Sequence, residues 1–153
     1  NCSMMKLVKL PIALFSTTTK VATRKNKPIT PSNSVSKSLD FRAEVEEVLD
    51  KLFIAIKPLE EINPNFQCQL SNAENSSENT KTLLVATKRG NFKFTPDMGK
   101  GILIFQSYIT GYHSYQFDYE SRLWLSIKPD KHDLRGMVTR EFLRHCTGCP
   151  QFN

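Results

Sequence analysis

The first 39 residues of this chain contain no aspartate or glutamate, although they hold seven lysines and arginines and eleven serines and threonines. All 15 acidic residues follow, so the net charge of +6 comes from the N-terminal segment and the rest of the chain is nearly neutral. A basic, acid-free segment rich in hydroxyl residues is typical of a mitochondrial transit peptide. We therefore divide the chain into a basic extension, residues 1–39, with a targeting or anchoring role, and a domain, residues 40–153.

Long apolar runs are missing as well. No stretch of the sequence approaches the roughly 18 consecutive apolar residues that a transmembrane helix needs. A short apolar run, residues 10–15, contains Pro11 and is followed by further basic residues, which argues against a secretory signal. We therefore expect a protein on the matrix side of the mitochondrion that does not span the membrane. An untargeted basic tail is the alternative interpretation.

The sequence also lacks recognisable catalytic motifs. It has no serine or cysteine in a nucleophile elbow and no glycine-rich phosphate loop. Its three histidines, His113, His132 and His145, fall in expected loops or at a helix end, where no convergent set of polar groups is predicted. We therefore expect a protein that is not an enzyme and has no cofactor.

Hydrophobic periodicity predicts a first amphipathic helix. Apolar residues recur at helical spacing from Phe41 to Ile56, after the candidate caps Ser38 and Asp40, and Pro58 stops the pattern. The outer face of this helix is acidic in its first half, with lysines in the later turns.

Alternating patterns then predict about six strands between residues 66 and 127, joined mostly by hairpins. Asp133 can cap a last helix that ends near Gly148. Hairpins imply an antiparallel sheet, and the two terminal helices can cover one of its faces, so the expected fold class is an α+β sandwich. The expected core residues are Phe41, Val45, Val48, Leu52, Phe53, Leu84, Phe94, Leu103, Phe105, Trp124, Met137 and Phe142.

Two cysteines near the C-terminus, Cys146 and Cys149, form a C-x-x-C pair. Two sulfurs at this spacing can chelate zinc or form a redox pair, but a structural zinc site needs four ligands. The alternative is that both remain ordinary thiols in a reducing compartment.

Several segments resemble the frataxin family. Residues 41–59 are similar to the first frataxin helix in their aromatic start, their E-x-x-L-D centre and their apolar stripe. Residues 103–117 match the family's strand and hairpin without a gap, including the central Gly111 and the aromatic pair Tyr115 and Phe117. Trp124 falls two residues after a family tryptophan, and residues 133–143 resemble the closing helix. The resemblance implies a frataxin-like fold over about residues 40–146.

Frataxins promote mitochondrial iron–sulfur cluster assembly, and the resemblance implies two candidate sites. The family's acidic ridge on the first helix corresponds here to Glu44, Glu47 and Asp50, which would bind iron. Acidic residues on an amphipathic helix also form ordinary solvated faces, which is the other interpretation. The exposed tryptophan that docks frataxins on the assembly scaffold corresponds to Ile104.

A frataxin fold also occurs as a docked accessory subunit on the hydrophilic arm of respiratory complex I in some bacteria. Because isoleucine replaces the docking tryptophan, we expect a non-catalytic accessory subunit of a large mitochondrial complex, first of all respiratory complex I. The alternatives are a genuine frataxin that binds iron and regulates cluster assembly, and a mitochondrial ribosomal subunit, whose RNA the basic extension would suit. The expected docking residues are Ile104 and four basic residues of the extension, Lys20, Arg24, Lys25 and Lys27.

Overall fold

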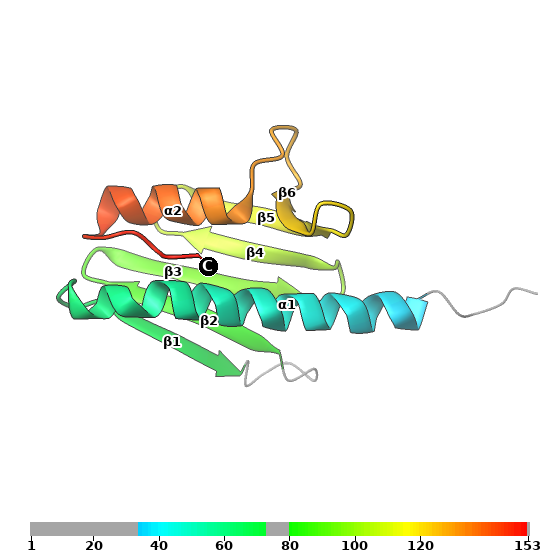
Figure 1. Cartoon of the computed structure of the whole chain (residues 1–153), viewed down its shortest axis with the longest axis horizontal. Helices are drawn as coiled ribbons and strands as arrows, with labels where there is room; N and C mark the ends of the chain where they lie inside the picture. The colour runs from blue at the N-terminus through cyan, green and yellow to red at the C-terminus, as the bar shows by residue number, and fades with distance from the viewer. Residues whose placement is uncertain (1–33, 73–79, 153) are drawn as a thin grey trace, which may run out of the picture. The chain divides into compact units, whose positions relative to one another are not determined.

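The computed structural model describes residues 34–72 and 80–152. Its elements follow in the order helix, six strands, helix, as Figure 1 shows. Their bounds are α1 Ser34–Ile56, the short 3-10 helix η1 Lys57–Glu61, β1 Gln67–Asn72, β2 Lys81–Thr87, β3 Gly90–Asp97, β4 Ile102–Ser107, β5 Gly111–Asp118, β6 Leu123–Ser126 and α2 Leu134–His145.

The six strands form one sheet in which each strand pairs antiparallel with the next along the chain. The register places Phe94 opposite Phe105 and Leu103 opposite Tyr115, so large apolar side chains lie side by side on one face. The predicted α+β class, with an antiparallel sheet of six strands and two helices, is confirmed.

Both helices cover the same face of the sheet (Figure 1), and one hydrophobic core lies between the helices and this face. The rings of Phe94 and Phe105 stack with centroids 4.6 Å apart, and Phe92 stacks on Phe142 of α2 at 4.7 Å. The opposite face of the sheet, called the outer face below, carries no helix among the described residues (Figure 1).

Two expected core residues lie elsewhere. Leu84 points to the outer face and is only half-buried, because its neighbours Leu83 and Val85 are the residues of β2 that face the helices. Phe53 packs against the edge of the core and is partly exposed. The other ten expected core residues are buried.

Helix α1 begins at Ser34, so the prediction that Ser38 or Asp40 caps it is wrong. The last proline before it is Pro31, and nothing in residues 34–39 stops a helix from forming there. The helix ends at Ile56, before Pro58, as predicted. At α2 the predicted cap is confirmed, because the Asp133 carboxylate accepts a hydrogen bond of 3.1 Å from the backbone N–H of Gly136.

The residues after α2 run back between the two helices (Figure 1). There the backbone N–H of Gln151 donates to the carbonyl of Ala55 at 3.3 Å, and Pro150 is buried. Gly148, with φ +92°, turns the chain into this path against Leu59 and Ile62. The segment after α2 therefore packs against the end of α1 and the residues that follow it.

Within the described ranges, none of the helices has the length and apolar character required to cross a membrane.

Candidate functional site

The acidic face of α1 is paired with cations of the same chain. Glu44 receives a hydrogen bond of 2.8 Å from Arg122, and both oxygens of Asp50 lie 3.1 Å from Lys81 Nζ. Glu47 pairs with Lys51, one turn later in the helix. The hydrogen bond from Lys51 is the main reason that the pKa of Glu47 lies below its usual value.

These three carboxylates, the predicted metal ligands, therefore point to three different partners. In residues 34–72 and 80–152, no group of three histidine, cysteine, aspartate or glutamate side chains is placed to hold a metal ion. The iron-binding hypothesis stays a prediction, and a metal would have to displace the lysine and arginine partners first.

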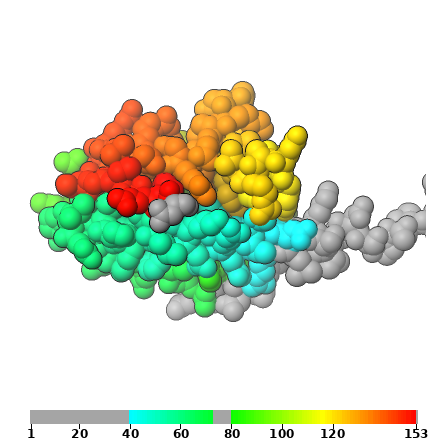
Figure 2. Space-filling model, in the orientation of Figure 1, coloured from blue at the N-terminus to red at the C-terminus, as the bar shows by residue number. Residues whose placement is uncertain are grey.

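Arg122 reaches α1 from the turn between β5 and β6. Its backbone φ of 58° lies in the left-handed region, and its guanidinium sits 5.0 Å from the centre of the Phe117 ring. In Figure 2 the β5–β6 turn, in yellow, meets the N-terminal half of the α1 surface, in cyan. The ion pair with Glu44 thus joins the edge of the sheet to the first helix.

The outer face of the sheet holds the second predicted site residue, Ile104. It lies in β4 between Thr95 of β3 and Ser114 of β5, and it is half-buried. Its two cross-strand neighbours are thus polar. Half-buried or exposed apolar side chains lie elsewhere on the same face or follow β6: Leu84, Ile102, Tyr112, Leu123, Leu125 and Ile127.

Charge is scarce on this outer face. Lys93 is the charged residue in its middle, and the acids Asp97 and Asp118 lie at the ends of their strands. Asp97 is held by Lys100, and Asp118 accepts hydrogen bonds from Ser121. A broad, nearly neutral face with exposed apolar side chains is the kind of surface that partner proteins cover.

The C-x-x-C cysteines are free thiols in different surroundings. Cys146 packs partly against the core, and burial raises the pKa of its thiol, while Cys149 is exposed with its Sγ 3.4 Å from the Pro150 carbonyl. Cys68 is buried in β1, and burial, helped by the nearby Glu60 carboxylate, raises its pKa to about 12. The structure thus shows thiols, with no disulfide among these three.

Of the histidines predicted to lie in loops or at a helix end, His113 lies instead in strand β5, whereas His132 lies in the loop after β6. His113 is buried in β5 with its Nε2 2.9 Å from Thr110 Oγ1, and its Nδ1 has no hydrogen-bond partner. His132 bridges the Tyr115 hydroxyl and the Asp130 carboxylate, each at 2.9 Å. Tyr115 is fully buried, and burial raises the pKa of its hydroxyl, so this chain of groups holds the loop after β6 onto the core.

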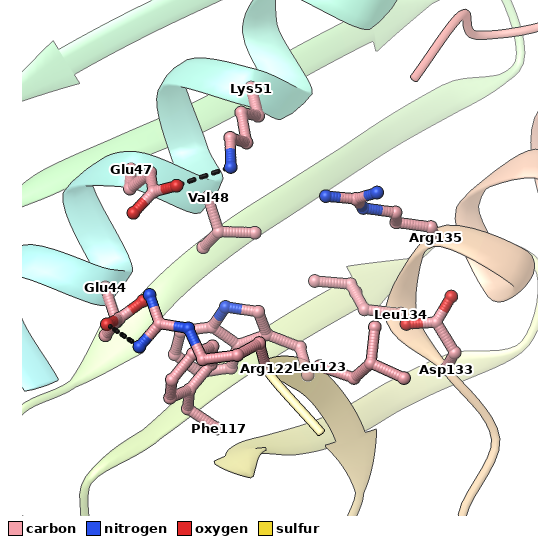
Figure 3. A pocket seen from close by; sticks show the side chains of 11 residues that line it. Glu44, Glu47, Val48, Lys51, Phe117, Arg122, Leu123, Asp133, Leu134 and Arg135 are labelled. Carbon is pink, nitrogen blue, oxygen red and sulfur yellow. Dashed lines mark hydrogen bonds and ion pairs between the residues drawn. The ribbon is translucent and has the colours of Figure 1, made fainter. Parts of the chain in front are cut away.

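A pocket of about 170 Å³, called the inter-helix pocket below, lies between α1, α2 and β6. Figure 3 shows Glu44 and Glu47 on one side of it and Arg135 reaching over it from α2. Its apolar lining consists of Val48, Phe117, Leu123, Trp124 and Leu134. Its remaining lining is charged, with Glu44, Glu47, Lys51, Arg122, Asp133 and Arg135.

The sequence did not indicate this pocket. Trp124 was expected in the core, and neither Arg122 nor Arg135 had a pattern that marked it. Only the fold brings residues of α1, the β5–β6 hairpin and α2 together. The basic residues predicted to anchor the extension, Lys20, Arg24, Lys25 and Lys27, lie outside the described residues.

The described part of the chain is thus an α+β sandwich with one open sheet face and one charged pocket between its helices. No protein-family model matches the sequence, and no curated protein matches it significantly.

Proposed function

We propose that this chain is a non-catalytic accessory subunit of frataxin-like fold, docked on a large mitochondrial complex through the outer face of its sheet. The observation that carries the proposal is that outer face, which is broad and nearly neutral and holds Ile104 in its middle, with exposed apolar side chains toward the β5–β6 side. Respiratory complex I is the proposed host, by analogy with the bacterial subunits of this fold.

The chemistry of α1 favours docking over iron binding. A ferrous ion prefers several converging carboxylate oxygens, whereas Glu44, Glu47 and Asp50 each hold a separate cation. The genuine-frataxin alternative predicts micromolar binding of ferrous iron that Glu44→Gln and Glu47→Gln abolish. The docking proposal predicts no such binding, and calorimetry with the isolated full chain under anaerobic conditions separates the two.

The host is tested by gradient fractionation of mitochondria followed by mass spectrometry of the fractions that contain the chain. Co-migration with respiratory complex I is the expected result. Migration as a free monomer that co-purifies with the cluster-assembly scaffold would favour the frataxin alternative, and migration with the mitochondrial ribosome would favour the ribosomal one.

The basic extension is tested by replacing residues 1–33 with an unrelated mitochondrial targeting sequence, which leaves α1 intact from Ser34. If the extension anchors the subunit, the replaced chain is imported but no longer co-migrates with the complex. If it serves only for targeting, co-migration is unchanged and the anchoring part of the proposal is wrong.

A further inference from the structure

Two hydrogen-bond donors that line the inter-helix pocket have no protein acceptor among the described residues, and the first of them, on Arg135, is exposed to water. The Arg135 guanidinium lines the pocket and takes part in no hydrogen bond or ion pair with any residue in the described ranges. The guanidinium lies 5.8 Å from the centre of the Phe152 ring, and its charge contributes to the lowered pKa of Glu47 without a hydrogen bond, which leaves its five N–H groups available. Figure 3 shows this side chain extending from α2 over the pocket toward α1.

The second unused donor is the indole N–H of Trp124. The indole lines the same pocket and packs edge-on against Phe41 and at a tilt against Phe117. No described residue accepts a hydrogen bond from its N–H. The indole nitrogen is not fully buried, so it keeps access to solvent. An indole can donate but not accept.

The acceptors of the pocket, in contrast, are already engaged. Glu44 is bound by Arg122, Glu47 by Lys51, and Asp133 caps the backbone N–H of Gly136. A cationic ligand would therefore compete with three existing partners and would leave Arg135 unpaired. An anionic ligand would find donors that have no partner in the described residues, although the N-terminal end of α2 is already capped by the Asp133 carboxylate.

The size and the walls of the pocket define the rest of the ligand. A volume of about 170 Å³ is that of roughly five or six liquid water molecules at about 30 Å³ each. This is room for a carboxylate and a short apolar stem, which Val48, Leu123 and Leu134 would contact.

We infer that the inter-helix pocket binds a carboxylate carried on a short apolar or aromatic stem. The Arg135 guanidinium and the Trp124 indole N–H donate to the carboxylate, and the apolar lining holds the stem. The ligand is either a free small carboxylic acid or the C-terminal carboxylate of a partner chain, since both present the same chemistry. Apart from Leu123 at the edge strand, which borders both surfaces, this site lies on the helix side of the sheet, and it does not rest on docking through the outer face.

Trp124 is the only tryptophan of the chain, so its indole N–H gives a single reporter resonance in a ¹H–¹⁵N spectrum. The experiment titrates the ¹⁵N-labelled full chain with phenylacetate and, at equal ionic strength, with the neutral isostere phenylacetamide. We expect a saturable shift of the indole resonance with phenylacetate at millimolar concentration, and at least tenfold weaker binding of the amide.

Two arginine variants make the test specific. Arg135→Gln is expected to weaken phenylacetate binding at least tenfold, whereas Arg144→Gln, an exposed arginine at the other end of α2, is expected to leave it unchanged. The indole resonance of each variant without ligand reports whether the fold is intact. Equal shifts with acid and amide, or equal effects of the two variants, would overturn the inference.

The two sources of the carboxylate are separated by a third titration, with a short peptide ending in a free C-terminal phenylalanine and with its C-terminal amide. Tighter binding of the free-acid peptide than of phenylacetate indicates a partner's chain end. Binding of phenylacetate without binding of the peptide indicates a small-molecule site. Failure of both phenylacetate and the free-acid peptide to bind would overturn the inference and would leave the docking proposal intact.

Discussion

At the scale of single residues, protonation of His113 makes the stability of the fold depend on pH. Its ring is buried, and burial, followed by the charges of Lys128 and His132, lowers its pKa below the usual 6.5. Arg140 acts in the same direction, and the buried carboxylate of Glu141, which accepts a hydrogen bond from Ser107, opposes them. The net effect is that the folded chain prefers the neutral imidazole.

The sign of the resulting pH dependence follows from proton linkage. Below about pH 6.5 the unfolded chain binds a proton at this histidine more readily than the folded chain, so stability decreases as the pH falls toward the lowered pKa. We expect the free energy of unfolding to decrease between pH 7 and 5.5. His113→Leu should flatten this decrease, and His145→Gln should not. Urea unfolding at several pH values measures this free energy. If it depends on pH in His113→Leu as it does in the unchanged chain, the assignment to His113 is contradicted.

The cysteines differ in reactivity because the thiolate is the nucleophile. We expect a thiol reagent at pH 8 to modify the exposed Cys149 first and Cys146 more slowly. Cys68, whose pKa is raised to about 12, should react only after unfolding. The measurement is the time course of labelling, resolved by peptide mass spectrometry in a Cys2→Ser background. Labelling of Cys68 as fast as Cys149 in the folded protein would contradict the position of β1.

At the scale of elements, the segment after α2 turns at Gly148, whose backbone conformation favours glycine. A Cβ on Gly148, at φ +92°, would lie 2.7 Å from Ile62 Cδ1, whereas one on Gly101, at φ +63°, would meet nothing within 4 Å. We expect Gly101→Ala to cost about 1 kcal/mol for backbone strain alone. Gly148→Ala should cost more, about 1–2 kcal/mol, because the ends of the Ile62 and Leu59 side chains must also move aside. Chemical denaturation of both variants measures the difference, and equal costs would show that the segment does not pack there.

The elements themselves were largely predictable, because hydrophobic spacing is a local property. The apolar stripe of α1, the hairpin turns and the Asp133 cap each depend on residues a few positions apart. Leu84 was misplaced because Leu83, Leu84 and Val85 are three apolar residues in a row, so alternation alone leaves the facing of β2 open. Which residues of β2 face the helices is set by the register with β3, where Val85 pairs with Phe92 and Leu83 with Phe94.

The sites were less predictable, because their contacts join distant parts of the chain. The acidic residues of α1 were visible in the sequence, but their partners were not. Glu44 pairs with a residue 78 positions later, and Asp50 with one 31 positions later. The inter-helix pocket was not predictable for the same reason. Its donors Arg135 and Trp124 belong to α2 and β6, and they line one pocket with α1 only in the folded chain.

At the scale of the whole molecule, the two helices and the segment after α2 cover one face of the sheet, and no other element of residues 34–72 and 80–152 covers the opposite face (Figure 1). The proposed function assigns this open face to a host complex. The chain offers a matched pair of isoleucines to test it: Ile104 in the middle of the outer face, and Ile54, exposed on α1.

The most direct test of the docking claim compares Ile104→Glu with Ile54→Glu in mitochondria, by gradient fractionation of the full chain. Thermal unfolding of the purified variants first establishes that both fold. We expect Ile104→Glu to release the chain from the megadalton fraction, because a carboxylate buried in an apolar interface without a partner is strongly unfavourable. Ile54→Glu should leave co-migration unchanged. Co-migration of a folded Ile104→Glu chain, or release by Ile54→Glu alone, would contradict docking through the outer face.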